Sequence, residues 1–225
     1  MTTSGSNDRL AGLLAQVLER DPWRLRPLCD RHGVELGDGV GALVREIGLD
    51  GANTIASLLR RRRGVEYAEI ARDVASKLKV GVEADADEVA VEHRILDAVL
   101  GRYVDGASAE DRATILRELQ AAGADVTDAG KVLVHGAWAA GSLAALVNGI
   151  GQQAVAAVVK QIVLKTVGRE AAKIAGRRAA AIASVAIPLL NVVMVGWTVV
   201  DLAGPAFRKT VPTVLEIALL RLEFG

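Results

Sequence analysis

The chain has 225 residues with 27 basic and 27 acidic side chains; 51% of its residues are hydrophobic and 3% are aromatic. A chain of this length can form one large domain or two small ones, each with a buried core. The balanced charge lacks the basic footprint of a nucleic-acid-binding protein, so no nucleic-acid partner is predicted. Abundant Ala, Leu and Val favour helices over strands, which predicts an all-α protein.

Cysteine content and the start of the chain bear on its location. Cys29 is alone, which excludes a disulfide within the chain and favours a reducing compartment. The first nine residues, MTTSGSNDR, are polar and lack the basic-then-apolar order of a signal peptide. Together these features predict a cytoplasmic protein.

Charge is distributed unevenly along the chain. Residues 1–131 carry 18 basic and 23 acidic side chains, a net charge of −5, whereas residues 132–225 carry 9 and 4, a net charge of +5. A sparsely charged, basic region favours contact with a membrane surface, an acidic partner or the acidic part of its own chain. We predict an acidic amphipathic helical domain over 1–130 and an apolar, basic helical region over 131–225.

The first region is expected to form a bundle of short amphipathic helices. Ser6 or Asn7 can cap a first helix, and Asp21 followed by Pro22 marks a second helix start. No alternation of period two is long enough to indicate a strand. Further helices are expected at about Val40–Ile47, Asn53–Arg62, Val65–Leu78 and Asp87–Tyr103, and from Ser108 to Leu119.

No pattern predicts a catalytic, cofactor or metal site. The GDGVGA stretch has the glycine spacing of a dinucleotide-binding loop, but no strand–helix–strand unit surrounds it, so turn glycines are the interpretation. Cys29 and His32 are three residues apart, whereas catalytic partners usually converge from distant parts of a sequence. His32, His93 and His135 are widely separated, which indicates surface histidines or buried ones with satisfied hydrogen bonds.

Two long uncharged runs dominate the second region: 23 residues over 137–159 and 22 residues over 179–200. As a helix the second run would be about 33 Å long, enough for the hydrocarbon core of a bilayer. Trp138 and Trp197 would lie at the same level of an antiparallel hairpin, as interfacial tryptophans do. We therefore predict a very apolar C-terminal helical hairpin, followed by a last amphipathic helix that starts at Pro212.

A basic stripe lies between the two uncharged runs. Its side chains recur every four residues and share one helix face. Such a stripe can rest on anionic lipid headgroups or on an acidic protein face. The predicted membrane or partner contacts are Trp138, Lys165, Arg169, Lys173, Arg177, Arg178 and Trp197.

The uncharged runs also fit a buried position. A helix that is apolar on all sides can lie at the centre of a soluble bundle. A permanent two-span topology would place the basic connector across the membrane, against the positive-inside tendency. The sequence therefore favours a hairpin that is buried in the fold or inserts conditionally over a permanent two-span protein.

Two stretches resemble the bacterial YaaW family: GANTIASLLRRRRGVEYAEIARDVASKLKV (51–80) and GPAFRKTVPTVLEIALLRL (204–222). The resemblance implies an uncharacterised family grouped with ubiquinol–cytochrome c chaperones, helical factors that assist assembly of a respiratory complex. It brings no catalytic residues. The matching positions include Thr54, Ile55, Arg60, Tyr67, Asp73, Gly204, Pro205, Arg208 and Pro212.

Two functions remain open from the sequence. The first is a non-enzymatic helical protein that associates with membranes, or inserts conditionally, through its apolar hairpin. The alternative is a soluble chaperone or assembly factor resembling the ubiquinol–cytochrome c chaperones. The expected partners are a membrane surface or a membrane-protein client, with a homo-oligomer as a further option and no cofactor. The expected location is the cytoplasm, with peripheral or conditional attachment to the inner membrane.

Overall fold

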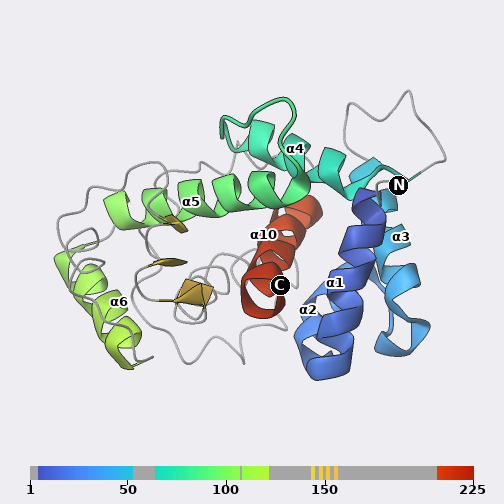
Figure 1. Ribbon diagram of the computed structural model, residues 1–225, viewed down its shortest axis with the longest axis horizontal. Coiled ribbons are helices and arrows are strands. Elements are labelled where there is room, and N and C mark those ends of the chain that lie inside the picture. Colours follow the sequence, from blue (N-terminus) through green and yellow to red (C-terminus); the bar gives the residue numbers. More distant parts are fainter. Residues whose placement is uncertain are drawn as a thin grey trace, which may run out of the picture. The chain divides into compact units, whose positions relative to one another are not determined.

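The computed structural model describes residues 5–52, 64–106, 108–121 and 207–225, together with 143–144, 147–148, 151–152 and 155–156. These residues form seven α-helices, two short 3-10 helices and further helical residues between 143 and 156, and they include no strand (Figure 1). The predicted all-α class is confirmed.

The expected helices that fall on described residues appear in the expected order, with shifted boundaries, whereas the helix expected at Asn53–Arg62 lies outside the described residues. The helix expected at Val40–Ile47 extends to Ala52, and the one expected to end at Tyr103 continues to Gly106. The elements are α1 (Ser6–Arg20), η1 (Pro22–Leu25), α2 (Arg26–His32), η2 (Leu36–Asp38), α3 (Val40–Ala52), α4 (Tyr67–Lys77), α5 (Glu88–Gly106), α6 (Ala109–Ala121) and α10 (Phe207–Phe224).

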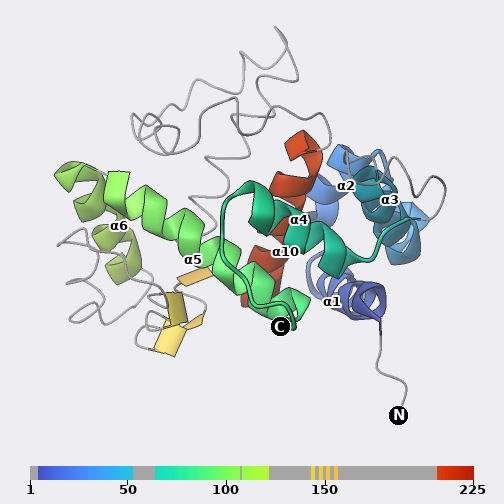
Figure 2. The same ribbon diagram turned by 90° about the horizontal axis from the view of Figure 1, so that it is seen from above.

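Contacts divide the chain into two compact units. The first contains residues 1–95 and 202–225, and the second contains residues 96–201. In the first unit α10 contacts α1, α2, α3 and α4, and Figures 1 and 2 show it lying among them. This division by contacts differs from the division by composition at residue 130, which describes polarity along the chain and stays a prediction.

The core of the first unit is built around α10. Every residue of α10 from 210 to 220 is buried, and α1, α2, α3 and α4 all contact this helix. At about 25 cal/mol per Å² of apolar surface, this burial is the main stabilising term of the unit. Its buried apolar side chains include Leu10, Leu14, Val17, Leu28, Leu43, Ile47, Ile70, Val74, Val91, Ile95, Val214, Leu215 and Ile217.

Ser6 and Asn7 cap a different helix from the one expected. The Ser6 hydroxyl accepts the Ala68 N–H at 2.8 Å, and the Asn7 side-chain oxygen accepts the Tyr67 N–H at 2.9 Å. These are the first N–H groups of α4, which lack partners within their own helix. The prediction that Ser6 or Asn7 caps α1 is therefore wrong: Gly5 precedes α1, and the two side chains fix α4 against it.

The last helix begins earlier than expected. Pro212 was predicted as its first residue, but α10 starts at Phe207 and contains Pro212 in its second turn. A proline inside a helix has no N–H to donate, so the carbonyl of Arg208 loses its usual helical partner. The first turn of α10 is therefore less firmly bonded to the rest of the helix.

In the second unit, part of the first uncharged run is described. Leu143, Val155 and Ala156 are buried, and Gly151 has a left-handed φ of +86° that interrupts the helical residues around it. The continuous helix expected over 137–159 is therefore wrong at Gly151. The second run, 179–200, lies outside the described residues, so the apolar hairpin stays a prediction. None of the helices in the described ranges has both the length and the apolarity to cross a membrane.

Candidate functional site

Most of the residues singled out in the sequence lie outside the described residues. This applies to the membrane or partner contacts, to Thr54, Ile55 and Arg60, and to Gly204 and Pro205. Their roles stay predictions. The undescribed contact residues are Trp138, Lys165, Arg169, Lys173, Arg177, Arg178 and Trp197.

The predicted residues that the structure describes lie at different places in the first unit. Tyr67 begins α4 and is fully buried, Pro212 is buried within α10, and Asp73 is half-buried on α4. For Arg208 only the backbone, within α10, is described. The structure therefore gives Tyr67 and Pro212 positions in the core.

A polar cluster, which we call the start junction, joins α2, α3 and the first turns of α10. The His32 side chain is 1% exposed; its Nδ1 lies 2.7 Å from Asp50 Oδ2 and its Nε2 lies 2.8 Å from Thr213 Oγ1. Lys209 Nζ donates to both oxygens of the Asp50 carboxylate, at 2.9 and 3.1 Å. The start junction consists of His32, Asp50, Lys209 and Thr213.

Burial disfavours the charged form of His32. Loss of hydration lowers the pKa of His32, and the positive charges of Arg31 and Lys209 lower it further, while the hydrogen bond to Asp50 raises it and is outweighed. The neutral imidazole is therefore the form that the native state favours at neutral pH. Because a carboxylate can only accept, Nδ1 carries the proton and Nε2 is left as an acceptor.

The start junction has the connectivity of a Thr–His–Asp catalytic triad, but it does not present a nucleophile. Thr213 is 1% exposed, in the middle of a helix that is buried on all sides. Its oxygen also lies 2.8 Å from the Lys209 carbonyl oxygen, so the single hydroxyl proton is shared between that oxygen and Nε2 of the neutral His32. An activated hydroxyl must reach a substrate carbonyl, and this one faces packed side chains. The cluster is therefore a structural junction in this conformation.

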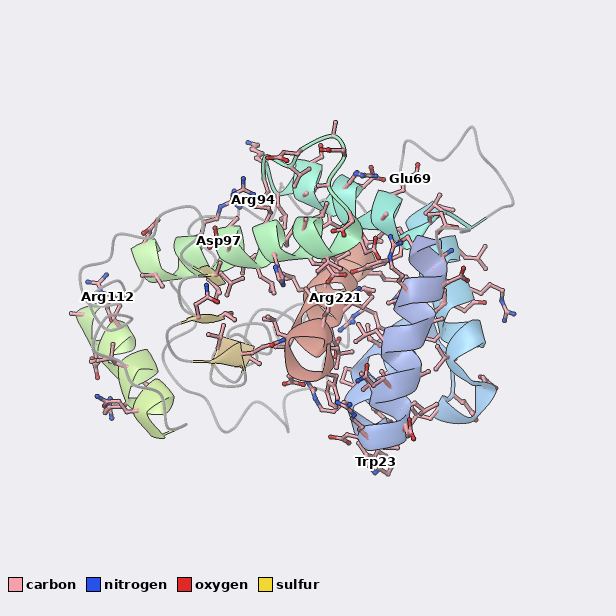
Figure 3. All side chains as sticks on the ribbon, in the orientation of Figure 1. Trp23, Glu69, Arg94, Asp97, Arg112 and Arg221 are labelled. Carbon is pink, nitrogen blue, oxygen red and sulfur yellow. The ribbon has the colours of Figure 1, made fainter. Side chains whose placement is uncertain are left out.

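A second cluster, the end junction, joins α10 to α5 and α4. Arg221 donates from Nε to Glu92 Oε2 at 2.7 Å and from Nη2 to Oε1 at 3.1 Å, and Glu92 is 0% exposed (Figure 3 labels Arg221). The Tyr67 hydroxyl faces Glu92 without making a hydrogen bond of ordinary geometry. Burial raises the pKa of Glu92 and Arg221 opposes that rise, while burial and the Glu92 charge raise the pKa of Tyr67.

Three further ion pairs tie the unit together. Glu88, one helical turn before Glu92 and equally buried, binds Arg9 of α1 in a bidentate pair, and this hydrogen bonding lowers the pKa of Glu88. Glu216 pairs with Arg31 at 2.8 Å, and burial raises the pKa of Glu216. The third pair is Arg24 with Glu223, at 2.6 Å.

None of these junctions was predicted from the sequence, although one signal was available. Glu88 and Glu92 are four residues apart and lie on the same helix as Val91 and Ile95, whose side chains are buried. Two carboxylates beside an apolar helix face indicate buried acids that need basic partners. No local pattern points to Arg9, Arg24 or Arg31 as those partners, because they come from other helices.

The described residues contain no group of three or more His, Cys, Asp or Glu side chains that could hold a metal ion. A hollow of about 370 Å³ lies beside α6, and its described lining residues, among them Arg112, Leu116, Arg117 and Gln120, all belong to that one helix. Two guanidinium groups and one amide on a single helix do not surround a small ligand from several sides, as the polar groups of a ligand site do. The junctions of α10 are therefore the most developed polar features of the described chain.

The first unit defines a helical scaffold whose two chain ends are locked together by buried ion pairs. No family model matches the chain, and no solved structure matches it. The chain is similar to a UPF0174 protein of Helicobacter pylori (strain J99 / ATCC 700824), with 28% identity over 196 residues, which are 86% of this chain and 75% of that protein.

This comparison corrects the family resemblance drawn from the sequence. The similar protein is named a UPF0174 protein, and neither a YaaW protein nor a chaperone of cytochrome c assembly is matched. Of the residues quoted for the resemblance, Tyr67 and Pro212 are buried in the first unit, where they serve the packing of the helices. The respiratory-chaperone relationship is therefore withdrawn.

Proposed function

We propose that this chain is a non-enzymatic helical protein that associates with membranes through its apolar segment, residues 131–206, and inserts conditionally. The observation that carries the proposal is the position of α10. Because α10 packs among the N-terminal helices, the segment between α5 and α10 leaves one scaffold and returns to it. The first unit thus forms its core from α1–α4, the start of α5 and α10.

Polar contacts hold the two helices, α5 and α10, on which the chain leaves and re-enters the first unit. Glu88 and Glu92 fix the start of α5 through Arg9 and Arg221. The start junction fixes the first turns of α10. This arrangement supports separate roles for the two parts of the chain. The first unit is the stable scaffold, and the two uncharged runs contact the membrane.

The described part of the first run supports conditional over permanent insertion. Leu143, Val155 and Ala156 are buried, whereas Asn148 and Gln152 are exposed. The carboxylate of Asp97 on α5, itself buried, accepts the Leu143 N–H at 2.9 Å. Apolar residues that are covered in this way need a rearrangement before they can meet lipid, since buried surface must first be exposed.

Vesicle flotation of the full chain tests the proposal. Vesicles of phosphatidylcholine with phosphatidylglycerol are compared with phosphatidylcholine alone. Val193→Asp places a charge in the second uncharged run, where about 2.5–3.5 kcal/mol opposes its entry into a bilayer centre, and should abolish flotation. Ser76→Asp adds the same charge at an exposed position of α4 and should float like the wild type.

A variant without the charges of the basic stripe tests whether the stripe contacts anionic lipid. Replacing Lys165, Arg169, Lys173 and Arg177 by Gln should remove the preference for anionic vesicles, because each basic residue near such a surface contributes about 1 kcal/mol. A wild-type chain that stays in the bottom fraction with both vesicle types overturns the proposal. The same follows if Val193→Asp floats as well as the wild type.

A soluble assembly factor that holds a membrane-protein client is the second candidate. One observation favours it: Trp23 on η1 is 69% exposed, with the Arg26 guanidinium 5.8 Å from its ring centre (Figure 3). Tryptophan and arginine are enriched at protein interfaces. This candidate is supported if flotation fails and Trp23→Ala weakens co-purification with membrane proteins of the source cell, and it is overturned if the wild type floats without any other protein.

A further inference from the structure

We draw no further inference here: the strongest candidate, the surface patch formed by the exposed Trp23 ring on η1 with the Arg26 guanidinium over it, carries no proposal because nothing in the described part of the chain shows what covers it.

Discussion

The two ends of α10 are held by different chemistry. At the start junction a neutral histidine and a partly exposed pair, Asp50 with Lys209, connect α10 to α2 and α3. At the end junction Arg221 binds Glu92 in a bidentate pair with the carboxylate fully buried. One junction depends on a buried histidine whose pKa is lowered and the other on a guanidinium that stays charged. The two ends of one helix therefore respond to pH through different groups.

Acidification has opposite signs at the two junctions. At the start it destabilises, because the native pKa of His32 is lowered. At the end junction the pKa of Glu92 is raised in the native state, so protonation of Glu92 stabilises the fold. This contribution is complete at a pH below the pKa of Glu92 in the unfolded chain, and it is lost as the pH rises through the pKa of Glu92 in the native state. The difference shows that burial alone does not set pH sensitivity: it lowers the pKa of a base and raises that of an acid.

The largest effect is expected from breaking the end junction. Arg221→Met leaves the buried Glu92 carboxylate without its partner, which should lower the free energy of unfolding by about 3–5 kcal/mol. Urea denaturation measures this loss. Arg45→Met removes a guanidinium from an exposed pair with Glu46 on α3 and should change stability by less than about 1 kcal/mol.

A double variant separates the charge from the packing. Arg221→Met with Glu92→Leu removes both charges, so most of the lost stability should return, since a buried ion pair can be replaced by apolar side chains at little cost. A double variant as unstable as Arg221→Met alone would show that the shape of the junction, and not the unpaired charge, determines the loss.

The start junction also depends on how closely α3 approaches α4. A Cβ on Gly51, the neighbour of Asp50, would lie 2.5 Å from Ile70 Cδ1 and 2.6 Å from Cγ1. Gly51→Ala should therefore destabilise by about 1–3 kcal/mol through overpacking. Gly41→Ala, in the same helix with no atom within 4 Å, should stabilise by about 0.4–1 kcal/mol. Equal thermal shifts for the two variants would contradict this close packing.

The smallest effect is expected from the hydroxyl of the start junction. Thr213→Val keeps the shape of the side chain and leaves Nε2 of His32 without a partner, which should cost about 1–2 kcal/mol at neutral pH. Thr213→Ser keeps the hydroxyl and should lose less. If Val and Ser variants unfold at the same urea concentration, the hydrogen bond to His32 contributes nothing to stability.

Part of this architecture could be predicted from the sequence. The apolar stripes of α1, α4 and α5 indicate their buried faces, and Leu10, Ile70, Val74 and Val91 are indeed buried. Periodicity works here because each helix buries one side. It works less well for α10, where residues 210–220 are buried on all sides and Thr210, Thr213 and Glu216 are in the core.

The junctions could not be predicted because their partners are distant in the chain. Arg31 and Glu216 are 185 residues apart, and Arg24 and Glu223 are 199 apart. Nothing local distinguishes these arginines from solvent-exposed ones. Ser6 and Asn7 illustrate the same limit, since a good capping residue does not reveal which helix it caps.

Hydrogen exchange along α10 of the full chain tests the contrast between its two ends most directly. Between about pH 7.5 and about pH 5.5, corrected for intrinsic exchange, the amides of 211 and 213–215, which the helix bonds to the carbonyls of 207 and 209–211, should lose protection while those of 216–222 keep theirs. In His32→Gln both halves should keep their protection. A uniform change along the whole helix, or loss at its start that persists in His32→Gln, would contradict the account.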